Sequence, residues 1–244
     1  MERVYNIAGL TVEMDCHGRT EQQAKAYICG ENKKPDIVIS QEEIDRIMDW
    51  FHSECPEFPD DLCEYYASGM IFYKKLLDFG GLQLHSSTVV VDGKAYAFTA
   101  DCGTGKSTHT QLWLNRFGDR AFILNDDKPA LRFEDGVWYA YGTPWSGKYD
   151  MSRNERVPLA GIAVVERGEE NEIQPFKGVA AIHAILKQVN RPSSAQYRIK
   201  LMELLDKLIT TVPVWKLRCN MAPQAVEVAY EAMCSKPCVE GEIV

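Results

Sequence analysis

A glycine-rich segment in the middle of the chain has residue types suited to holding the phosphates of a nucleotide. It reads Ala100-Asp101-Cys102-Gly103-Thr104-Gly105-Lys106-Ser107. This fits the Gly-x-x-x-x-Gly-Lys-Ser pattern of phosphate-binding loops, except that alanine holds the first place. Gly103 and Gly105 permit a tight turn whose N–H groups converge on phosphate oxygens at the start of a helix. Lys106 supplies a positive charge, and the Ser107 hydroxyl is placed for Mg²⁺.

The segment therefore predicts a site for a nucleoside triphosphate, most simply ATP, with Mg²⁺; GTP or another donor is left open. A chance glycine-rich turn is the alternative, but a β-rich run leads into this one and a helical segment leads out, as the motif requires. The residues expected to contact the nucleotide are Asp101, Cys102, Gly103, Thr104, Gly105, Lys106, Ser107 and Thr108.

A pair of carboxylates follows at the end of the next apolar strand. Asp126 lies 20 residues after Lys106 and Asp127 follows it, just past the β-rich run 121–124 and Asn125. A carboxylate in that place holds the metal of many nucleotide-binding proteins. A second carboxylate could take the proton of an incoming hydroxyl, although the sequence does not say which aspartate has which role. We therefore predict Ser107, Asp126 and Asp127 as metal ligands. A solvated acidic turn is the alternative.

These residues require a scaffold of hairpins and helices. Runs 88–91 and 94–99 flank Asp92-Gly93, a strong hairpin signal. Helices are expected over 108–117, 179–189, 195–210 and 222–233, and His109 is interpreted as structural. Further strands are expected over 121–124, 130–133, 137–141, 160–165 and 214–217, with an acidic turn over 166–172.

The first 80 residues predict a smaller α/β segment. Strands are expected over 5–14 and 36–39, and Ser40 with Glu43 has the form of a capping box opening a helix that ends before Pro56. A second helix is expected over 60–77. Its apolar stripe is interpreted as core rather than as a ligand site: Tyr65, Tyr66, Met70, Tyr73, Leu76 and Leu77.

Composition excludes several classes of protein. The 244 residues are 45% hydrophobic and 25% charged, as in ordinary globular domains, and the net charge of −8 argues against a nucleic-acid partner. Apolar runs fall far short of the roughly 20 residues of a membrane span, and no secretory signal is evident, so a cytoplasmic protein is expected. The eight cysteines are then expected to be reduced, and a zinc site at Cys234 and Cys238 is disfavoured.

Residues 82–150 resemble the bacterial HPr kinase/phosphorylase family and its phosphoenolpyruvate-carboxykinase-like relatives. In that family a histidine opens a hairpin that leads into the phosphate loop, and a buried strand then delivers Asp-Asp. Here Leu84-His85 stand before the hairpin, His85 is 16 residues before Asp101, and Asn125-Asp126-Asp127 follow. The resemblance implies a mixed α/β (α+β) fold, with a P-loop core of mixed sheet and hairpins flanked by helices. It also implies that His85, Lys106, Asp126 and Asp127 form the catalytic centre.

Departures from the family limit what carries over. Thr108 stands where a glutamate often follows the loop serine, and the downstream phosphorylase signature is not recognisable, so HPr is not the expected substrate. The segment from Gly142 to Lys148 looks like the loop that follows the Asp-Asp hairpin in smaller kinase-like relatives. Lys148, Arg153 and Arg167 are candidates for additional phosphate or substrate contacts, with a surface role for each as the alternative.

These observations favour a kinase whose acceptor is a hydroxyl, first a serine of a peptide or protein and next a small alcohol or free serine. A carboxykinase-type lyase and a nucleotide-binding regulatory module without turnover are the alternatives. We expect an N-terminal α/β segment over residues 1–80, a catalytic domain over 81–236 and a loose tail over 237–244. Acceptor choice is assigned to residues 1–80, and the assembly state, a homo-oligomer included, is left open.

Overall fold

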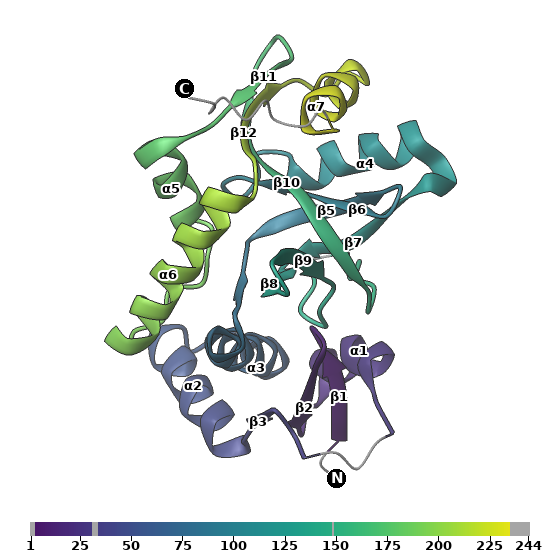
Figure 1. Ribbon diagram of the computed structural model, residues 1–244. Helices are drawn as coiled ribbons and strands as arrows, with labels where there is room; N and C mark the ends of the chain where they lie inside the picture. Colours follow the sequence, from purple (N-terminus) through teal and green to yellow (C-terminus); the bar gives the residue numbers. More distant parts are fainter. Residues whose placement is uncertain (1–2, 31–33, 148, 235–244) are drawn as a thin grey trace.

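The N-terminal part of the computed structural model is a small sheet with three helices. The structure describes residues 3–30, 34–147 and 149–234, so the expected tail over 237–244 lies outside the described residues. The sheet consists of β1 (Arg3–Ile7), β2 (Leu10–Met14) and β3 (Ile37–Ile39), and the helices are α1 (Gly18–Ala24), α2 (Gln41–Glu54) and α3 (Asp60–Leu76). These elements lie together at one end of the molecule (Figure 1).

The single strand expected over 5–14 is wrong, because a tight turn divides it. Ala8 and Gly9 have φ values of 53° and 74°, so the chain reverses and β1 pairs antiparallel with β2. An Ala-Gly pair is a weaker turn signal than Asn-Gly or Asp-Gly, since alanine resists positive φ. The capping box that opens α2 is confirmed: the Ser40 side chain accepts from the backbone of Glu43, and the Glu43 side chain accepts from the backbone of Ser40.

The rest of the chain forms a mixed sheet. Its nine strands in the described residues are β4 (Gly81–Gln83), β5 (Ser86–Val91), β6 (Lys94–Thr99), β7 (Ala121–Asp127), β8 (Ala130–Glu134), β9 (Val137–Tyr141), β10 (Arg156–Arg167), β11 (Glu172–Pro175) and β12 (Val214–Cys219). Seven follow the order β4-β8-β9-β10-β6-β5-β7, and β12 joins β10 and carries β11. The pairs of β10 with β6 and with β12 are parallel, whereas the other pairs are antiparallel.

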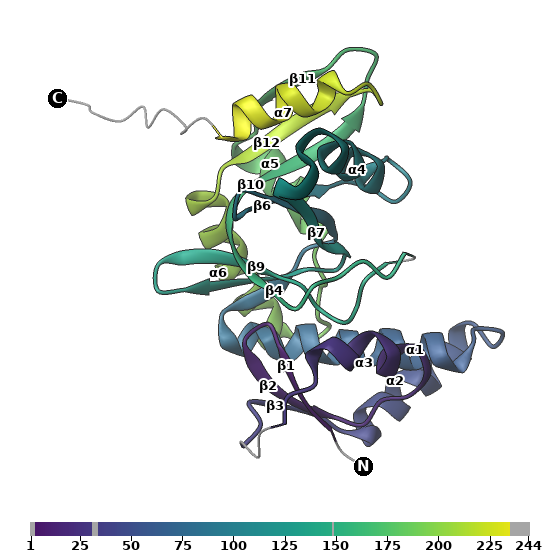
Figure 2. The ribbon, with the colours of Figure 1, turned by 90° about the vertical axis from the view of Figure 1, so that its right-hand side faces the viewer.

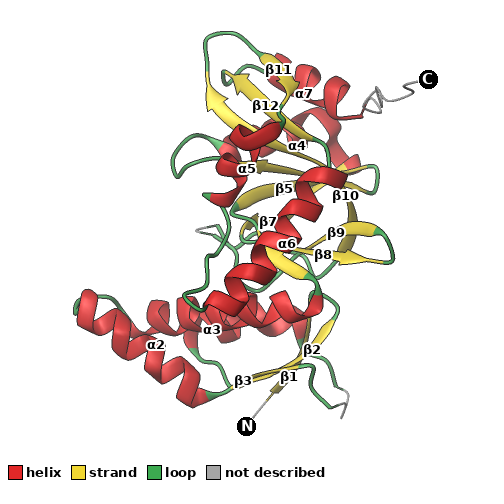
Figure 3. Cartoon of the chain, turned by 60° about the vertical axis from the view of Figure 1, so that its left-hand side comes forward, coloured by secondary structure: helices red, strands yellow, loops and turns green. Residues whose placement is uncertain are grey.

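Four further helices cover this sheet: α4 (Lys106–Phe117), α5 (Gly178–Leu186), α6 (Ala195–Thr211) and α7 (Gln224–Cys234). Short 3₁₀ turns occupy Lys25–Tyr27, Leu77–Phe79 and Gly118–Arg120. Helices α4 and α7 lie at the end of the molecule away from α2 and α3 (Figure 2), and α6 spans the distance between α3 and α5, beginning near the end of α3 (Figure 3). A mixed α/β fold is confirmed. Among the described helices, none combines the length and apolar character needed to cross a membrane.

Several elements differ from the expected ones at their ends or were missed. Helix α1 and the short strands β4 and β11 were not expected, because each has only three to seven residues and little periodicity. Strand β10 extends well beyond 160–165 in both directions, so part of the expected acidic turn is strand. Helix α5 ends at Leu186 rather than at residue 189. The residues after α5 consequently lie in a loop, and one of them enters the site described below.

The register of three neighbouring strands gathers distant parts of the chain. Strand β5 pairs with β6 across the expected Asp92-Gly93 turn, where both residues have positive φ, and with β7 on its other edge. Ser86, the first residue of β5, pairs with both Thr99 and Asp127. The start of β5, the end of β6 and the end of β7 therefore lie side by side.

His109 is a core residue, as expected. It lies on α4 with 3% of its surface exposed, and its Nε2 accepts a hydrogen bond of 3.0 Å from Nε1 of Trp113. Burial lowers the pKa of His109 to about 4. The ring is therefore neutral in the folded protein at neutral pH, and protonating it would both bury a charge and abolish the bond from Trp113.

A depressed histidine pKa makes folding stability depend on pH. Below a pKa of about 6.5 the unfolded chain binds a proton that the folded protein takes up only near pH 4, so stability is lost as pH falls through this window. His109→Gln retains a hydrogen-bond acceptor without a titrating ring. We expect urea unfolding to show that the variant loses on the order of 2 kcal/mol less stability than wild type between pH 7 and pH 5. Equal losses in the two proteins would contradict this role.

Candidate functional site

The glycine-rich loop joins β6 to α4 and has the backbone conformation that its glycines permit. Gly103 and Gly105 have φ values of 77° and 118°, a region that other residues rarely adopt. Gly105 is the N-cap of α4, so the first-turn N–H groups of the helix face the loop without intrahelical partners. Lys106 is 7% exposed, and its Nζ donates to the carbonyl oxygen of Ala100 at 3.0 Å. The loop thus encloses a cation and a set of N–H donors.

The hydroxyl of Ser107 donates to Oδ1 of Asp126 at 3.0 Å, which brings two of the three predicted metal ligands together. Asp126 is 5% exposed, its N–H donates to the carbonyl of Met151, and its own carbonyl accepts from Gly147. A Cβ on Gly147 would lie 3.0 Å from that carbonyl oxygen, so a glycine is needed for this close approach. The backbone on both sides therefore fixes the Asp126 carboxylate opposite Ser107.

This pair fits Mg²⁺, which prefers oxygen ligands and usually takes one or two carboxylates together with phosphate oxygens and water. Within the described residues, no group of three or more His, Cys, Asp or Glu side chains could hold a metal ion. Of the disfavoured zinc pair, Cys234 contacts the Tyr96 hydroxyl at 3.0 Å, while Cys238 lies outside the described residues.

Asp127, the neighbouring carboxylate, has a different partner. Its Oδ1 lies 2.7 Å from Nε2 of His85. Asp127 has a φ of 129°, an unfavourable backbone conformation for a non-glycine residue and one that is found at functional sites. Burial raises the pKa of the Asp127 carboxyl, but the hydrogen bond and charge of His85, with the charges of Lys128 and Lys106, outweigh burial and hold the pKa below its ordinary value. Asp127 is therefore an ionised carboxylate in a partly buried site.

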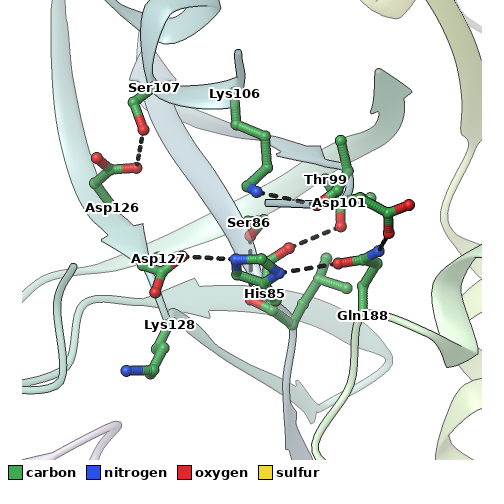
Figure 4. A network of polar contacts seen from close by, with 12 residues as sticks. His85, Ser86, Thr99, Asp101, Lys106, Ser107, Asp126, Asp127, Lys128 and Gln188 are labelled. Carbon is green, nitrogen blue, oxygen red and sulfur yellow. Dashed lines mark hydrogen bonds and ion pairs between the residues drawn. The ribbon is translucent and has the colours of Figure 1, made fainter. Parts of the chain in front are cut away.

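A chain of hydrogen bonds connects Asp127 back to the glycine-rich loop (Figure 4). Nε2 of Gln188 donates to Oδ1 of Asp101 at 2.9 Å, and Oε1 of Gln188 lies 2.9 Å from Nδ1 of His85. A carboxylate only accepts, so Asp101 fixes the orientation of the amide, and the amide oxygen then requires a proton on Nδ1 of His85. This leaves Nε2 as the histidine nitrogen that shares its proton with Asp127.

Some of the predicted site residues lie close together in the structure, and others do not. It brings together His85, Asp101, Lys106, Ser107, Asp126 and Asp127. Thr104, Gly103 and Gly105 shape the loop, whereas Cys102 and Thr108 are exposed at its surface. Arg167 donates to the carbonyls of Gly103 and Thr104, so it lies against the loop.

Arg153 is not part of this arrangement. The Arg153 guanidinium lies 4.2 Å from the ring centre of Phe122 and pairs with Glu155 at 3.9 Å, which supports the surface role left open for it. Lys148 lies outside the described residues.

Two residues of the site were not expected from the sequence. Gln188 lies just beyond α5, in a segment expected to be helix, and nothing in the local sequence distinguishes it. Lys128 follows Asp127 directly, which was a usable signal. Its Nζ lies 4.9 and 4.6 Å from the ring centres of Tyr65 and Tyr66, and burial lowers its pKa, opposed by the charge of Asp127.

Two cavities flank the loop. One, of 570 Å³, is lined by residues 100–104, the end of β10 and one face of α5. The other, of 490 Å³, lies between residues 103–109, the end of β10 and residues 219–221. Arg167 lines both. Each volume is within the range of small-molecule sites, so there is room beside the loop for the rest of a nucleotide.

The fold and this site define a mixed α/β protein with a glycine-rich loop and two differently partnered carboxylates beside it. A family model described as SynChlorMet cassette protein ScmC matches residues 61–230, and the chain therefore belongs to the ScmC family. None of the curated proteins matches the chain.

Among solved structures, the chain is similar to the Hpr(Ser) kinase/phosphatase from Coxiella burnetii. The identity is 12%, the TM-score is 0.37, and the match covers 62% of this chain and 90% of the other. The resemblance to HPr kinases is thus matched by a distant structural likeness, which at this TM-score lends no support to a shared activity.

Binding of a nucleotide at the loop can be tested without any assay of turnover. Cys102 is exposed in the loop, and Cys55 is exposed at the end of α2. The rate of alkylation at each cysteine can be measured by peptide mass spectrometry. We expect MgATP to slow the alkylation of Cys102 and to leave the alkylation rate of Cys55 unchanged, because a bound nucleotide would cover only the loop cysteine.

Lys106→Ala provides the control, since it removes the cation of the loop and should abolish the protection. Alkylation of Cys102 at the same rate with and without MgATP at millimolar concentration would contradict nucleotide binding here.

Proposed function

We propose that the protein is a kinase that transfers the terminal phosphoryl group of a nucleoside triphosphate, most simply MgATP, to a hydroxyl acceptor. A serine of a peptide or protein is the leading acceptor. The observation that carries the proposal is the separation of partners at the two adjacent aspartates: Asp126 faces Ser107 of the loop, whereas Asp127 faces His85. Phosphoryl transfer needs these two functions, a metal ligand and a base, side by side.

The loop supplies the nucleotide side of the proposal. First-turn N–H groups of α4 and the Lys106 ammonium would neutralise the outer phosphates. Ser107 and Asp126 would hold Mg²⁺, which would offset the negative charge that develops on the leaving group. Lys106 would exchange its present bond to the Ala100 carbonyl for a phosphate oxygen. Asp101 accepts from Gln188 in the structure, so its role is in positioning rather than in contacting the phosphates directly.

Asp127 would act as the base for the acceptor. Oδ1 is engaged by His85, so we assign the acceptor proton to Oδ2. An electron pair of the acceptor oxygen forms the new bond to the terminal phosphorus, and the bond from that phosphorus to the bridging oxygen breaks. The bridging oxygen leaves with its electron pair on the nucleoside diphosphate, while Asp127 becomes a carboxylic acid and later returns the proton to solvent. No further reactant is required.

His85 would have an electrostatic role. The Asp101–Gln188 pair holds a proton on Nδ1, which aims Nε2 at Asp127. A histidine held in this way keeps Asp127 ionised between turnovers and provides positive charge near the transferring group, where it stabilises the transition state most. Gln188 therefore acts through His85 as a positioning residue.

Separate variants should divide binding from transfer. With γ-labelled ATP, Mg²⁺ and a mixture of seryl peptides, wild type should yield labelled peptide. Asp127→Asn removes the base without removing the phosphate site, so we expect transfer to fall by about 100-fold to 10,000-fold while the Kd for MgATP changes little. Lys106→Ala should instead weaken MgATP binding, measured by calorimetry.

Other outcomes would point to other functions. Wild-type transfer by Asp127→Asn would contradict the assigned base. Tight MgATP binding with no labelled product, across peptides and small alcohols, would favour a regulatory module without turnover. Release of carbon dioxide from oxaloacetate would favour the carboxykinase alternative.

The pH profile should report the pairing of His85 with Asp127. The protonated form of Asp127 cannot accept a proton, so transfer is lost as pH falls through its pKa, which His85 holds below the ordinary value. His85→Gln removes this charge, so that burial, which raises the pKa of Asp127, is less opposed. We therefore expect the acidic limb of the pH profile of kcat/KM to move to higher pH. His52→Gln removes a histidine that pairs with Asp60 at 3.1 Å, away from the site, and should leave the limb in place. An unmoved limb in His85→Gln would contradict the pairing.

A further inference from the structure

Two adjoining cavities connect the reaction centre with the outer surface of the N-terminal helices. The inner cavity, of 210 Å³, lies between α3 and residues 187–190 and includes His85 and Lys128, the neighbours of Asp127. The outer cavity, of 580 Å³, lies between α2, α3 and residues 190–193. Met70 and Asn190 line both. We call these two neighbouring cavities together, between α3 and residues 187–193, the α3 trough.

The outer end of the trough exposes large apolar side chains that would be expected in a core. Trp50 is 52% exposed and Met70 is 38% exposed, and Ile47 is partly buried beside them. The sequence pattern assigned Met70 and Tyr66 to the core. This was wrong for both, because the face of α3 that carries them lines the trough. Grouped exposed apolar side chains of this kind mark a binding surface more often than an isolated one does.

The charge along the trough is opposite to that of the whole protein. The chain has 27 Lys and Arg against 35 Asp and Glu. The side chains lining the two cavities include five basic residues, Arg46, Lys74, Lys128, Lys187 and Arg191, but a single acidic one, Glu43. Glu43 is paired with Lys75 at 2.6 Å, and Arg46 is paired with Glu42 at 2.8 Å, so the remaining basic residues still outnumber the acidic one. A positive trough on a negative protein favours an occupant that carries negative charge.

We propose that the α3 trough binds the acceptor as an extended acidic peptide, with its serine in the inner cavity and an apolar side chain against Trp50 in the outer cavity. The proposal rests on the proposed kinase function, because the inner cavity matters only as the entrance to Asp127. Continuity with the reaction centre supports a substrate rather than a permanent partner, and the mixture of basic and apolar lining fits a peptide better than a small alcohol.

The helix sets the spacing of the recognised residues. Tyr66, Met70 and Lys74 lie on successive turns of α3, from the inner cavity to the outer one. Eight residues of helix span about 12 Å at 1.5 Å per residue. An extended peptide advances about 3.3 Å per residue, so the same span takes about four residues. The apolar residue should thus lie about three to five positions from the serine, on one side of it.

Synthetic peptides can test this arrangement through both binding and transfer. Peptides would contain one serine in an Ala-Asp background, with a single leucine placed at each of five positions on either side. We expect leucine about four positions away, on one side only, to raise both affinity, measured by calorimetry, and kcat/KM by about tenfold. Trp50→Ala should remove this preference, so that peptides with and without leucine bind and react alike. Ile199→Ala, which removes a side chain 61% exposed on α6, should retain the preference.

The outcomes separate the trough from the kinase. Three results would contradict peptide binding in the trough. They are equal activity with leucine at every position, a leucine preference that Trp50→Ala retains, and transfer to small alcohols without peptide binding. Peptides that bind with the Trp50-dependent preference but receive no phosphate would uphold the trough and contradict the kinase. Thermal melting would show whether Trp50→Ala is folded. If it is not, the double variant Arg46→Glu/Lys74→Glu should favour lysine over aspartate in the peptide background, and an unchanged charge preference would overturn the proposal.

Discussion

The pairing of β5 with two neighbours at once is the constraint on which the site depends. Strand β6 leads into the glycine-rich loop, and β7 carries the two aspartates. These two strands do not pair with each other, because β5 lies between them. Ser86 at the start of β5 pairs with Thr99 on one edge and Asp127 on the other, so His85 is held between the loop and the carboxylates. A slip of one residue between β5 and β7 would turn the aspartates to the opposite face of the sheet. The Asp92-Gly93 turn, with positive φ at both residues, fixes the other pairing, that of β5 with β6.

Within that frame, local charge rather than net charge determines what the site can do. The protein is acidic overall, yet the loop contributes helix N–H groups and Lys106, and the trough contributes further cations. Two adjacent carboxylates would repel each other if they shared a single environment. Here their partners differ: Asp126 accepts from the neutral hydroxyl of Ser107, whereas Asp127 pairs with a histidine held by Gln188 and Asp101. This arrangement allows one carboxylate to hold a cation while the other is kept ionised as a base.

The sequence was sufficient for the parts of the site that are local. The glycine-rich turn between a strand and a helix, the hairpin and the capping box each rest on residues within a few positions of one another, and the structure contains all three. Gln188 could not be found in this way, because its role depends on contact with Asp101, 87 positions away. The α3 stripe was misjudged for a related reason: Tyr66 and Met70 have the spacing of core residues, and only tertiary packing decides that a trough rather than another element faces them. The turn at Ala8-Gly9 was missed because alanine rarely adopts a positive φ.

The division of labour between the aspartates is the central claim, and a metal titration tests it most directly. Mn²⁺ can replace Mg²⁺ and is visible by electron paramagnetic resonance, so its affinity for the protein with ATP can be measured in Asp126→Asn and Asp127→Asn. The structure places the Ser107 hydroxyl on Asp126 and His85 on Asp127. We therefore expect Asp126→Asn to weaken Mn²⁺ binding by about tenfold or more, while Asp127→Asn binds it as tightly as wild type. Equal weakening in both variants, or weakening in Asp127→Asn alone, would contradict the account.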